Sequence, residues 1–456
     1  VQAKDKYCAD AMAAEGCPIV DGERIPLQLF ADDLTLFALT YRRLMCLLVA
    51  LREWCEAFGM SVNIRKCEVL IVHPNADIRD FVRKACPVGM RSSTTYDVQM
   101  QVMPWVTRAR YLGIYHDSEK AFESCCEELL AKGQRTMFAL VDKLRLKGLL
   151  SPNVSLKCFN VSVRSVLSFA VQVWGPAYIL EILQGAGDGR SLCFDKALSN
   201  KMVQVQRDFL QFVAGVKRVP YRLLFREFDQ YPLHVHWAKL VFRFWNSIVR
   251  KPGSLHHHVL RDEIRLAIGS NLEGKGWGTV VLKVLNLLGH FDGVSSSLNV
   301  DEQVDSISSM ELDVGALVEE LIRRFDDDWG STRLQIDPRD FVSDGLQPGV
   351  KMCRYEQWMG PAGHCPFYIP RKQHVSLMRF RLCVWETEVN RPAGRARSDR
   401  RCSACRAVDA IEDERHILLE CPKYADIRSE LWALGATSTA SMKQVMGVDN
   451  QKALAS

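Results

Sequence analysis

Two adjacent aspartates, Asp32 and Asp33, are the residues of this chain whose types and position best fit metal chemistry. Apolar residues alternate with polar or small ones over 25–29 and again over 34–38, which predicts a β-hairpin with both carboxylates at its tip. Mg²⁺ prefers a few carboxylate oxygens together with phosphate oxygens and water, and paired metals stabilise phosphoryl transfer. Asp-Asp is also ordinary turn chemistry, since Asp caps its own backbone. Taken alone, the pair favours the ordinary turn.

A second set of metal ligands lies near the C-terminus. Cys402, Cys405, His416 and Cys421 follow the spacing C-x2-C-x10-H-x4-C. Three thiolates and one imidazole form a closed tetrahedral zinc shell, which is structural because no position is left for water. We expect the first two cysteines on a tight turn and the other two ligands at a helix that Pro422 interrupts. The alternative, three ordinary cysteines and a surface histidine, stays open because C-x-x-C also occurs by chance.

Basic residues precede these ligands. Between 371 and 406 there are ten basic residues against three acidic ones. Arginines beside a zinc module are suited to phosphate backbones, and such binding depends steeply on salt. The candidate nucleic-acid contacts are Arg395, Arg397, Arg400 and Arg401.

The elements that must position the aspartates follow them in the chain. Residues 44–58 have the apolar spacing of an amphipathic helix, and Gly59 is suited to the cap that ends it. The next stretch, 60–72, is expected to turn into a strand and carries Lys66. Further on, Tyr111-Leu112-Gly113 has the pattern of a strand that ends at a turn.

In this order the segments resemble the reverse transcriptases of non-LTR (LINE-type) retrotransposons. The aspartate pair resembles the family's catalytic hairpin, the helix, glycine and strand resemble its fourth conserved palm element, and Tyr111-Leu112-Gly113 resembles its primer grip. Residues 165–170 and 173–175 resemble the helix that follows the thumb. The cysteine-histidine segment looks like the terminal CCHC module of LINE-type elements. The resemblance covers residues 5–185 and 375–430.

The resemblance implies RNA-directed DNA polymerase activity, with an RNA template, a DNA primer or target, deoxynucleotide triphosphates and Mg²⁺. Asp32 would coordinate both metals and Asp33 would assist. Lys66 would protonate the leaving pyrophosphate, although a solvated surface lysine explains it equally well. Tyr111, Leu112 and Gly113 would place the primer end. The family also implies a nuclear location for the parent element.

A third catalytic aspartate, which the family carries on an earlier strand, is not evident. Asp5, Asp10 and Asp21 precede the pair, and none lies in a strand-like run; residues 7–15 read as the end of a helix. We therefore expect a C-terminal fragment that lacks the fingers and most of the palm and has negligible polymerase activity by itself. The competing class is a non-catalytic nucleic-acid-binding remnant of a decayed or domesticated element. A group II intron maturase is disfavoured by the CCHC segment.

The patterns together predict an α+β fold. Helices are expected over 121–150, 154–183 and 201–216, and the aromatic residues of 223–249 are expected to be core. The predicted parts are a partial palm (1–118), a helical thumb and connector (119–250), a loop-rich, partly acidic linker (251–370), a basic zinc module (371–435) and a tail (436–456). The acidic segment 301–328 is either a linker or a helix.

Five basic residues of the predicted thumb either contact phosphates or form a solvated helix face. They are Lys132, Arg135, Lys143, Arg145 and Lys147.

Composition is compatible with this assignment without demonstrating it. The net charge of +5 is mild, and sixteen cysteines without a signal peptide favour reduced thiols and metal ligands in an intracellular protein. The apolar stretch 166–183 contains polar and charged residues, which argues against a membrane span.

Overall fold

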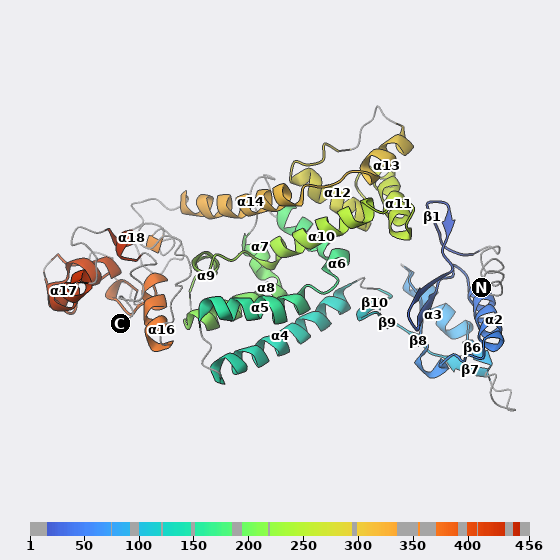
Figure 1. Ribbon diagram of the computed structural model, residues 1–456, viewed down its shortest axis with the longest axis horizontal. Coiled ribbons are helices and arrows are strands. Elements are labelled where there is room, and N and C mark those ends of the chain that lie inside the picture. Colours follow the sequence, from blue (N-terminus) through green and yellow to red (C-terminus); the bar gives the residue numbers. More distant parts are fainter. Residues whose placement is uncertain are drawn as a thin grey trace. The chain divides into compact units, whose positions relative to one another are not determined.

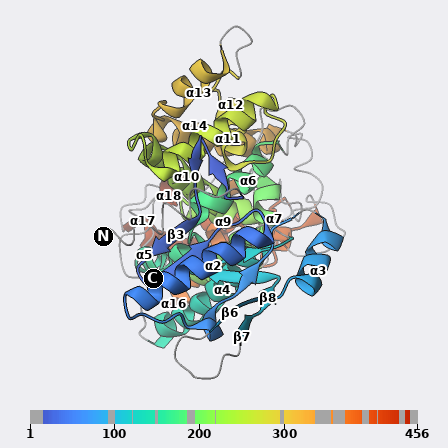
Figure 2. The ribbon, with the colours of Figure 1, turned by 90° about the vertical axis from the view of Figure 1, so that its right-hand side faces the viewer.

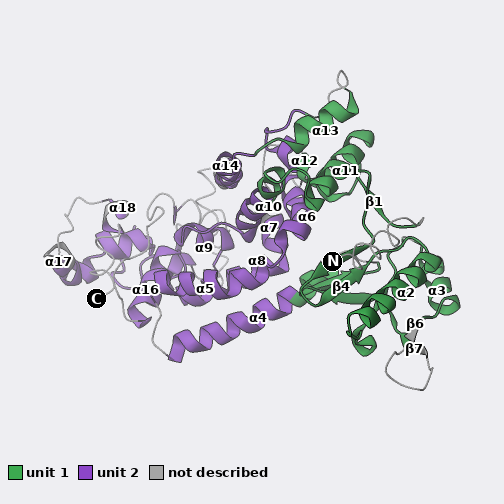
Figure 3. Ribbon diagram, turned by 45° about the vertical axis from the view of Figure 1, so that its right-hand side comes forward, with its two compact units in different colours: residues 1–128, 244–282, 293–311 green, residues 129–243, 283–292, 312–456 purple. Residues whose placement is uncertain are grey.

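The computed structural model of the chain divides into two compact units. Unit 1 comprises residues 1–128, 244–282 and 293–311, and unit 2 comprises 129–243, 283–292 and 312–456 (Figure 3). The residues that the structure describes are 16–73, 75–91, 100–119, 122–146, 151–184, 194–217, 219–293, 299–334, 354–355, 371–390, 399–407, 409–433 and 441–446.

Both helices and strands are present (Figure 1). The strands are β1 (Ile19–Val20), β2 (Glu23–Arg24), β3 (Leu27–Phe30), β4 (Asp33–Leu36), β5 (Val69–Leu70), β6 (Val88–Arg91), β7 (Met100–Met103), β8 (Trp105–Val106), β9 (Arg108–Tyr111) and β10 (Ile114–Asp117). The longer helices are α2 (Tyr41–Ala57), α3 (Ala76–Ala85), α4 (Glu123–Leu146), α5 (Pro152–Leu167), α6 (Val171–Gln184), α7 (Phe194–Ser199), α8 (Lys201–Ala214), α9 (Tyr221–Glu227), α10 (Leu233–Val249), α11 (Leu255–Gly269), α12 (Trp277–Leu287), α13 (Val300–Ser308), α14 (Val314–Leu334), α16 (Arg371–Arg381), α17 (Ala425–Ala433) and α18 (Met442–Val445). Short helical turns are η1 (Ile64–Lys66), η4 (Glu388–Asn390), η6 (His416–Glu420) and η7 (Pro422–Tyr424). An α+β class is therefore correct at this level.

Unit 1 is built around α2, as the apolar spacing of 44–58 predicts. The Thr40 side chain caps the helix by accepting from the Arg43 backbone N–H, and Gly59, with φ +64°, follows its last turn. Leu48 on α2 packs into a small core with Ile64, and β6 and β7 lie beside the helix (Figure 2).

The strands of unit 1 pair only two by two among the described residues. Four of the pairs are antiparallel, and β5–β8 is parallel. The strand expected over 60–72 is reduced to β5, because residues 64–66 form the η1 turn instead. That part of the prediction was wrong.

Unit 2 begins with long helices in the region expected to form the thumb. The expected helix over 121–150 corresponds to α4 and that over 201–216 to α8. Helices α4 and α5 approach closely, since a Cβ on Gly133 would lie 2.2 Å from Leu167 Cδ2. The single helix expected over 154–183 was wrong. Helices α5 and α6 meet at 95°, and Ala170, with φ +53°, lies in the break between them.

The aromatic residues of 223–249 belong to the interior, as predicted. Phe225, Trp237, Phe242 and Trp245 are each at most 1% exposed. Within unit 2, the Trp237 ring lies 5.2 Å from that of Trp174, and its Nε1–H donates to Ser168 Oγ. These rings are packed and hydrogen-bonded, so they are not available for base stacking.

The loop-rich linker expected over 251–370 was wrong for much of residues 255–334, and residues 335–353 and 356–370 lie outside the described residues. The structure has α11, α12, α13 and α14 between residues 255 and 334. Several acidic residues there form ion pairs: Glu320 accepts from both Arg323 and Arg324 one turn away on α14, and Asp305 accepts from Arg261 of α11. For the acidic segment 301–328 the sequence left a linker and a helix open, and the structure has the helices α13 and α14; composition alone does not show the ion pairs that stabilise them.

The described helices were also compared with the requirements of a membrane span. No single one is both long enough and apolar enough to cross a bilayer; only the sharply bent α5–α6 pair has a suitable length and composition when the two are joined.

Candidate functional site

The β3–β4 hairpin places the aspartate pair at its tip, as the alternation of apolar residues predicts. The strands pair from Leu27↔Leu36 to Phe30↔Asp33. Ala31, with φ +53°, and Asp32 form the two-residue turn, and Asp33 begins β4. Both aspartates are exposed, so their carboxylates can meet a ligand.

The base of the hairpin is fixed to the core of unit 1. Leu36, at the far end of β4, packs against the cluster that contains Leu48 of α2. The Phe37 backbone N–H also donates to the Pro26 carbonyl at 2.8 Å, which closes the open end of the hairpin. The acidic tip is therefore carried by a strand pair anchored at its other end.

A third carboxylate does not join this tip among the described residues. Asp21, at the β1–β2 turn, accepts hydrogen bonds from Arg261 and Arg265 of α11 and contacts His258. Burial alone would raise the pKa of Asp21, but these partners together lower it below its usual value. Asp21 is thus engaged in an ion-pair network, and Asp5 and Asp10 lie outside the described residues, as does the expected helix end over 7–15.

Lys66 lies at the end of η1 and is exposed. It forms no ion pair within the part of the chain that the structure describes, and no contact joins it to the aspartate pair. Its exposed position therefore fits a solvated surface lysine as well as a lysine that protonates the leaving pyrophosphate.

Tyr111, Leu112 and Gly113 form the turn of the β9–β10 hairpin. Leu112 and Gly113 have φ of +48° and +87°, the left-handed conformations of a type I′ turn. On the neighbouring strands, the Arg108 and Arg110 guanidinium carbons lie 4.7 and 5.9 Å from the centre of the Tyr115 ring. Two exposed arginine side chains of this hairpin therefore lie against the same tyrosine ring.

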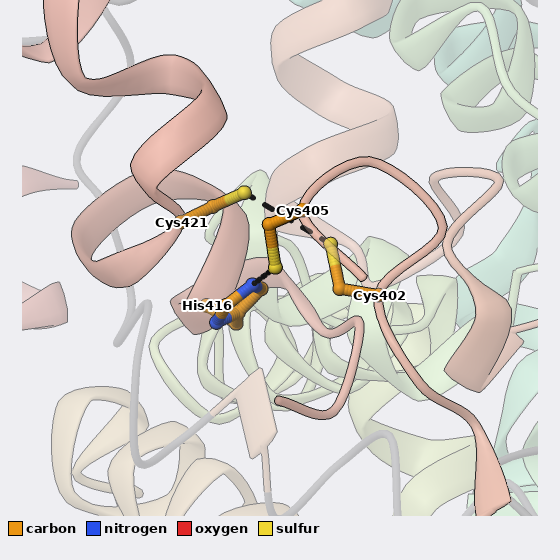
Figure 4. Close-up of side chains that lie close together, drawn as sticks. All are labelled: Cys402, Cys405, His416 and Cys421. Carbon is orange, nitrogen blue, oxygen red and sulfur yellow. Dashed lines mark hydrogen bonds between the residues drawn. The ribbon is translucent and has the colours of Figure 1, made fainter. Parts of the chain in front are cut away.

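The four zinc-ligand candidates converge in unit 2 (Figure 4). Cys402 and Cys405 lie on one tight turn, His416 begins η6, and Cys421 directly follows it. Their ligand atoms all lie within 4.8 Å of one another. They are the one group of three or more such ligands that the described residues bring together.

The distances fit a single ion. Cys402 Sγ lies 3.9 Å from Cys421 Sγ, and Cys405 Sγ lies 3.4 Å from His416 Nε2. A tetrahedral zinc with ordinary Zn–S and Zn–N bonds separates its ligands by about 3.5 to 3.8 Å. These residues would hold zinc as a structural ion that joins the turn at 402–405 to the helix at 416–420.

Acidic residues between the ligands hold the two halves of the site. Asp413 accepts from the His416 backbone N–H, and Glu412 accepts from the Ser403 backbone N–H and hydroxyl. His416 Nδ1 faces Glu420 at 3.8 Å, the arrangement that leaves Nε2 free for a metal. The sequence prediction did not include these acidic residues. Their position between the first and the last zinc-ligand candidate is the feature of the sequence that could have indicated them.

The thiols differ in their electrostatic surroundings. Burial raises the pKa of Cys402 to about 11. A hydrogen bond from the Ala407 backbone, followed by its contact with His416, lowers the pKa of Cys405 to about 7. Cys405 is therefore the thiol most readily deprotonated, as metal binding requires.

The predicted arginine contacts beside the zinc site need one correction. Arg400 is 2% exposed and donates to the Glu388 and Val389 carbonyls, so it supports the fold and cannot reach a phosphate. Arg401 is exposed. Arg395 and Arg397 lie outside the described residues.

The predicted thumb residues are mostly on the surface of α4. Arg135, Lys143 and Arg145 are exposed, and Lys132 is half-buried. Lys147 lies outside the described residues.

Comparison of the chain with family models, with characterised proteins and with solved structures found no match, so its function must be inferred from its own residues.

Proposed function

We propose that this chain is part of a reverse transcriptase of the non-LTR retrotransposon type, and that the β3–β4 tip holds its catalytic Mg²⁺. The observation that carries the proposal is the exposed Asp32–Asp33 pair at a two-residue turn whose strands are anchored beside α2. Adjacent carboxylates on a fixed hairpin suit a cation that must also bind the phosphates of a nucleotide. The family resemblance of the flanking segments supports the same assignment.

Bound Mg²⁺ would neutralise the charge that develops on the phosphates during nucleotide addition. Asp32 and Asp33 hold the cation. The β9–β10 hairpin, with Arg108 and Arg110 exposed, contacts the primer backbone, and Lys66 supplies a proton to the leaving pyrophosphate. The substrates are an RNA template, a DNA primer end and deoxynucleotide triphosphates, and the parent enzyme acts in the nucleus. The zinc site maintains the fold of the C-terminal module.

One observation favours a non-catalytic nucleic-acid-binding remnant as the second candidate. Among the described residues, the aspartate pair belongs to no group of three or more metal ligands, and Asp21 is engaged by arginines. Two-metal chemistry needs more carboxylate oxygens than this tip supplies. In this alternative the chain retains its nucleic-acid contacts and performs no chemistry.

Manganese binding tests the proposal directly. The chain would be titrated with Mn²⁺ in the presence of an RNA–DNA duplex and a deoxynucleotide triphosphate, and free Mn²⁺ would be followed by electron paramagnetic resonance. We expect Asp32→Asn with Asp33→Asn to abolish the protein-dependent binding. The control, Glu53→Gln with Glu127→Gln, removes two exposed carboxylates elsewhere and should leave it unchanged. Equal binding by both double variants would overturn the proposed site.

Primer extension can exclude the non-catalytic remnant. An RNA-templated DNA primer would be incubated with the chain, deoxynucleotides and Mg²⁺. We expect no extension by this chain alone, since its described residues offer two of the carboxylates. Extension that disappears in the Asp32→Asn, Asp33→Asn variant would instead exclude the non-catalytic remnant.

A further inference from the structure

Basic side chains meet at the C-terminal end of α8 in unit 2. Arg371, the first residue of α16, donates to the carbonyls of Phe212 and Val213. The Arg145 and Arg371 guanidinium carbons lie 5.2 and 5.4 Å from the centre of the Phe212 ring. Two cations from helices far apart in the sequence therefore share one aromatic ring.

A hollow of about 310 Å³ lies at the same end of α8, where Gly215 caps the helix. It is lined by Gly215, Val216, Lys217, Arg379, Val384 and Glu386. Gly215 brings this lining against α16, because a Cβ built there would lie 2.4 Å from Val375 Cγ2 and 3.0 Å from the Arg371 Nη2. The absence of a side chain at Gly215 thus lets the end of α8 lie close to α16.

The positive charge of this region is poorly neutralised. Within the described part of the chain, neither Lys217 nor Arg379 forms an ion pair, although both are exposed and line the hollow. Arg145 approaches Asp142 only at 4.0 Å. Burial, followed by the charge of Arg145, lowers the pKa of Arg371. Like charges held together in this way are stabilised by an anion.

Two features oppose an anion and must be outweighed. Glu386 is one of the lining residues, and the C-terminal end of a helix carries partial negative charge. Arg371 donates to the Phe212 and Val213 carbonyls, and His374 also contacts the Val213 carbonyl, which offsets part of that second effect. Two lining cations, Lys217 and Arg379, with Arg371 and Arg145 against the nearby end of α8, then outweigh the one lining carboxylate, Glu386.

We propose that this hollow binds backbone phosphates of a nucleic acid, with Lys217 and Arg379 in direct contact and Arg371 and Arg145 supplying the surrounding positive potential. The proposal rests on the proposed function, since it adds a nucleic-acid contact to a protein argued to act on nucleic acid. The hollow is of a size to accept a phosphate with its sugar. Contacts of this kind position a strand without reading its sequence.

Salt-dependent binding of a labelled RNA–DNA duplex tests the site. Kd would be measured by fluorescence anisotropy from about 50 to 200 mM salt. We expect Lys217→Gln with Arg379→Gln to weaken binding on the order of tenfold at about 0.1 M salt and to reduce the slope of log Kd against log salt by about 2. Glu386→Gln should shift Kd in the opposite direction, because it removes the opposing charge.

The matched control removes two other exposed arginine charges. Arg250→Gln with Arg323→Gln acts on side chains that carboxylates already neutralise, Glu311 and Glu320, each at 2.8 Å. We expect its Kd and salt slope to equal those of the unchanged chain. The same loss in both double variants would show a general charge effect and overturn the site.

Two competition experiments distinguish between the anions that the hollow could bind. Inorganic phosphate and polyglutamate, at matched charge and ionic strength, should fail to displace the duplex. Displacement by phosphate would indicate a site for free phosphate, and displacement by polyglutamate a site for acidic protein; either result overturns the proposal. If the unchanged chain binds the duplex and the Lys217, Arg379 variant binds equally well, this site is wrong while the proposed function stands. If the unchanged chain does not bind, both are wrong.

Discussion

Arg381 of α16 and Glu227 of α9 form a bidentate ion pair, with Nε to Oε1 at 2.6 Å and Nη2 to Oε2 at 3.0 Å. Their side chains are 0% and 4% exposed. The Tyr355 hydroxyl donates to Glu227 Oε2 at 2.6 Å, and Arg381 Nη1 donates to the Met446 carbonyl at 2.7 Å. Within unit 2, a buried ion pair therefore joins two helices whose paired residues are separated by 154 positions in the sequence. Both charged groups also form hydrogen bonds to other residues.

Glu227→Gln is expected to destabilise the chain by about 3 to 5 kcal/mol, because Arg381 would remain charged and buried without its counter-ion. Tyr355→Phe should cost less, about 1 to 3 kcal/mol, since it removes one hydrogen bond to a charged acceptor. The free energy of unfolding from urea denaturation measures both.

An exposed pair gives the control for this effect. Arg52 and Glu56 lie one turn apart on α2 at 3.7 Å, with side chains 31% and 46% exposed. Glu56→Gln should change the free energy of unfolding by no more than about 1 kcal/mol. Similar losses for Glu227→Gln and Glu56→Gln would contradict the importance of burial.

The buried side chain of His234 should make the folded chain less stable in acid. It is fully buried on α10 against the Trp237 ring, and burial lowers its pKa to about 3. An unfolded histidine takes a proton below about pH 6.5. The unfolded chain then binds more protons than the folded one, so stability falls as pH decreases from about 6.5 towards 3.

His234→Phe should reduce this dependence, because phenylalanine fills a similar space and does not titrate. Between about pH 6 and 5 we expect the variant to lose about 1 kcal/mol less per pH unit than the unchanged chain. Urea unfolding of both chains at pH 8 supplies the reference, where neither state of His234 is protonated. Parallel curves over the acid range would show that His234 does not contribute.

Local patterns explain the parts of the structure that the sequence predicted. The β3–β4 hairpin follows from alternating residues within ten positions, and the zinc ligands from a spacing of two, ten and four residues. The type I′ turn at Leu112 and Gly113 is likewise local. In each case the residues that determine the geometry are neighbours in the chain.

The failures have a different physical origin. Neither Gly nor Pro stands at residues 168–171, so no local signal marks the break at Ala170, where the Trp174 Nε1–H donates to the Phe169 carbonyl. Arg400 was counted as surface charge because composition does not show that the Val389 carbonyl accepts its hydrogen bond. The Arg381–Glu227 pair depends on distant segments meeting, which sequence patterns do not show.

Gly133 provides a test of helix packing in the predicted thumb. A Cβ there would lie 2.2 Å from Leu167 Cδ2, and Leu167 is 0% exposed. Gly133→Ala should destabilise the chain by about 1 to 3 kcal/mol through overpacking, although alanine favours a helix by about 1 kcal/mol.

The same substitution at Gly269, the last residue of α11, is the matched control, because no atom lies within 4 Å of a Cβ built there. Gly269→Ala should be neutral or stabilising by up to about 1 kcal/mol. Adding Leu167→Ala to Gly133→Ala should relieve the clash, so the double variant should lose less than the sum of the two single changes. Additive losses would mean that α4 and α5 do not meet at this position.

Zinc content is the most direct test of the C-terminal site. The full chain should contain one equivalent of zinc, and Cys402→Ser should lose it, because a serine hydroxyl is a poor replacement for a thiolate ligand. Chelation should expose 402–424 to protease, since ligands from the turn and from the helix would no longer be joined. Inductively coupled plasma mass spectrometry and limited proteolysis measure these outcomes.

Cys46→Ser serves as the control for zinc loss, because Cys46 is an exposed free thiol on α2. It should retain the full equivalent. The acidic residues make a finer distinction: Glu412→Ala removes the acceptor of the Ser403 backbone N–H without changing a ligand, so it should weaken zinc affinity by about 10- to 100-fold while leaving the stoichiometry at one. A chain that contains no zinc, or a Cys402→Ser variant that retains it, would show that these four residues are not a metal site.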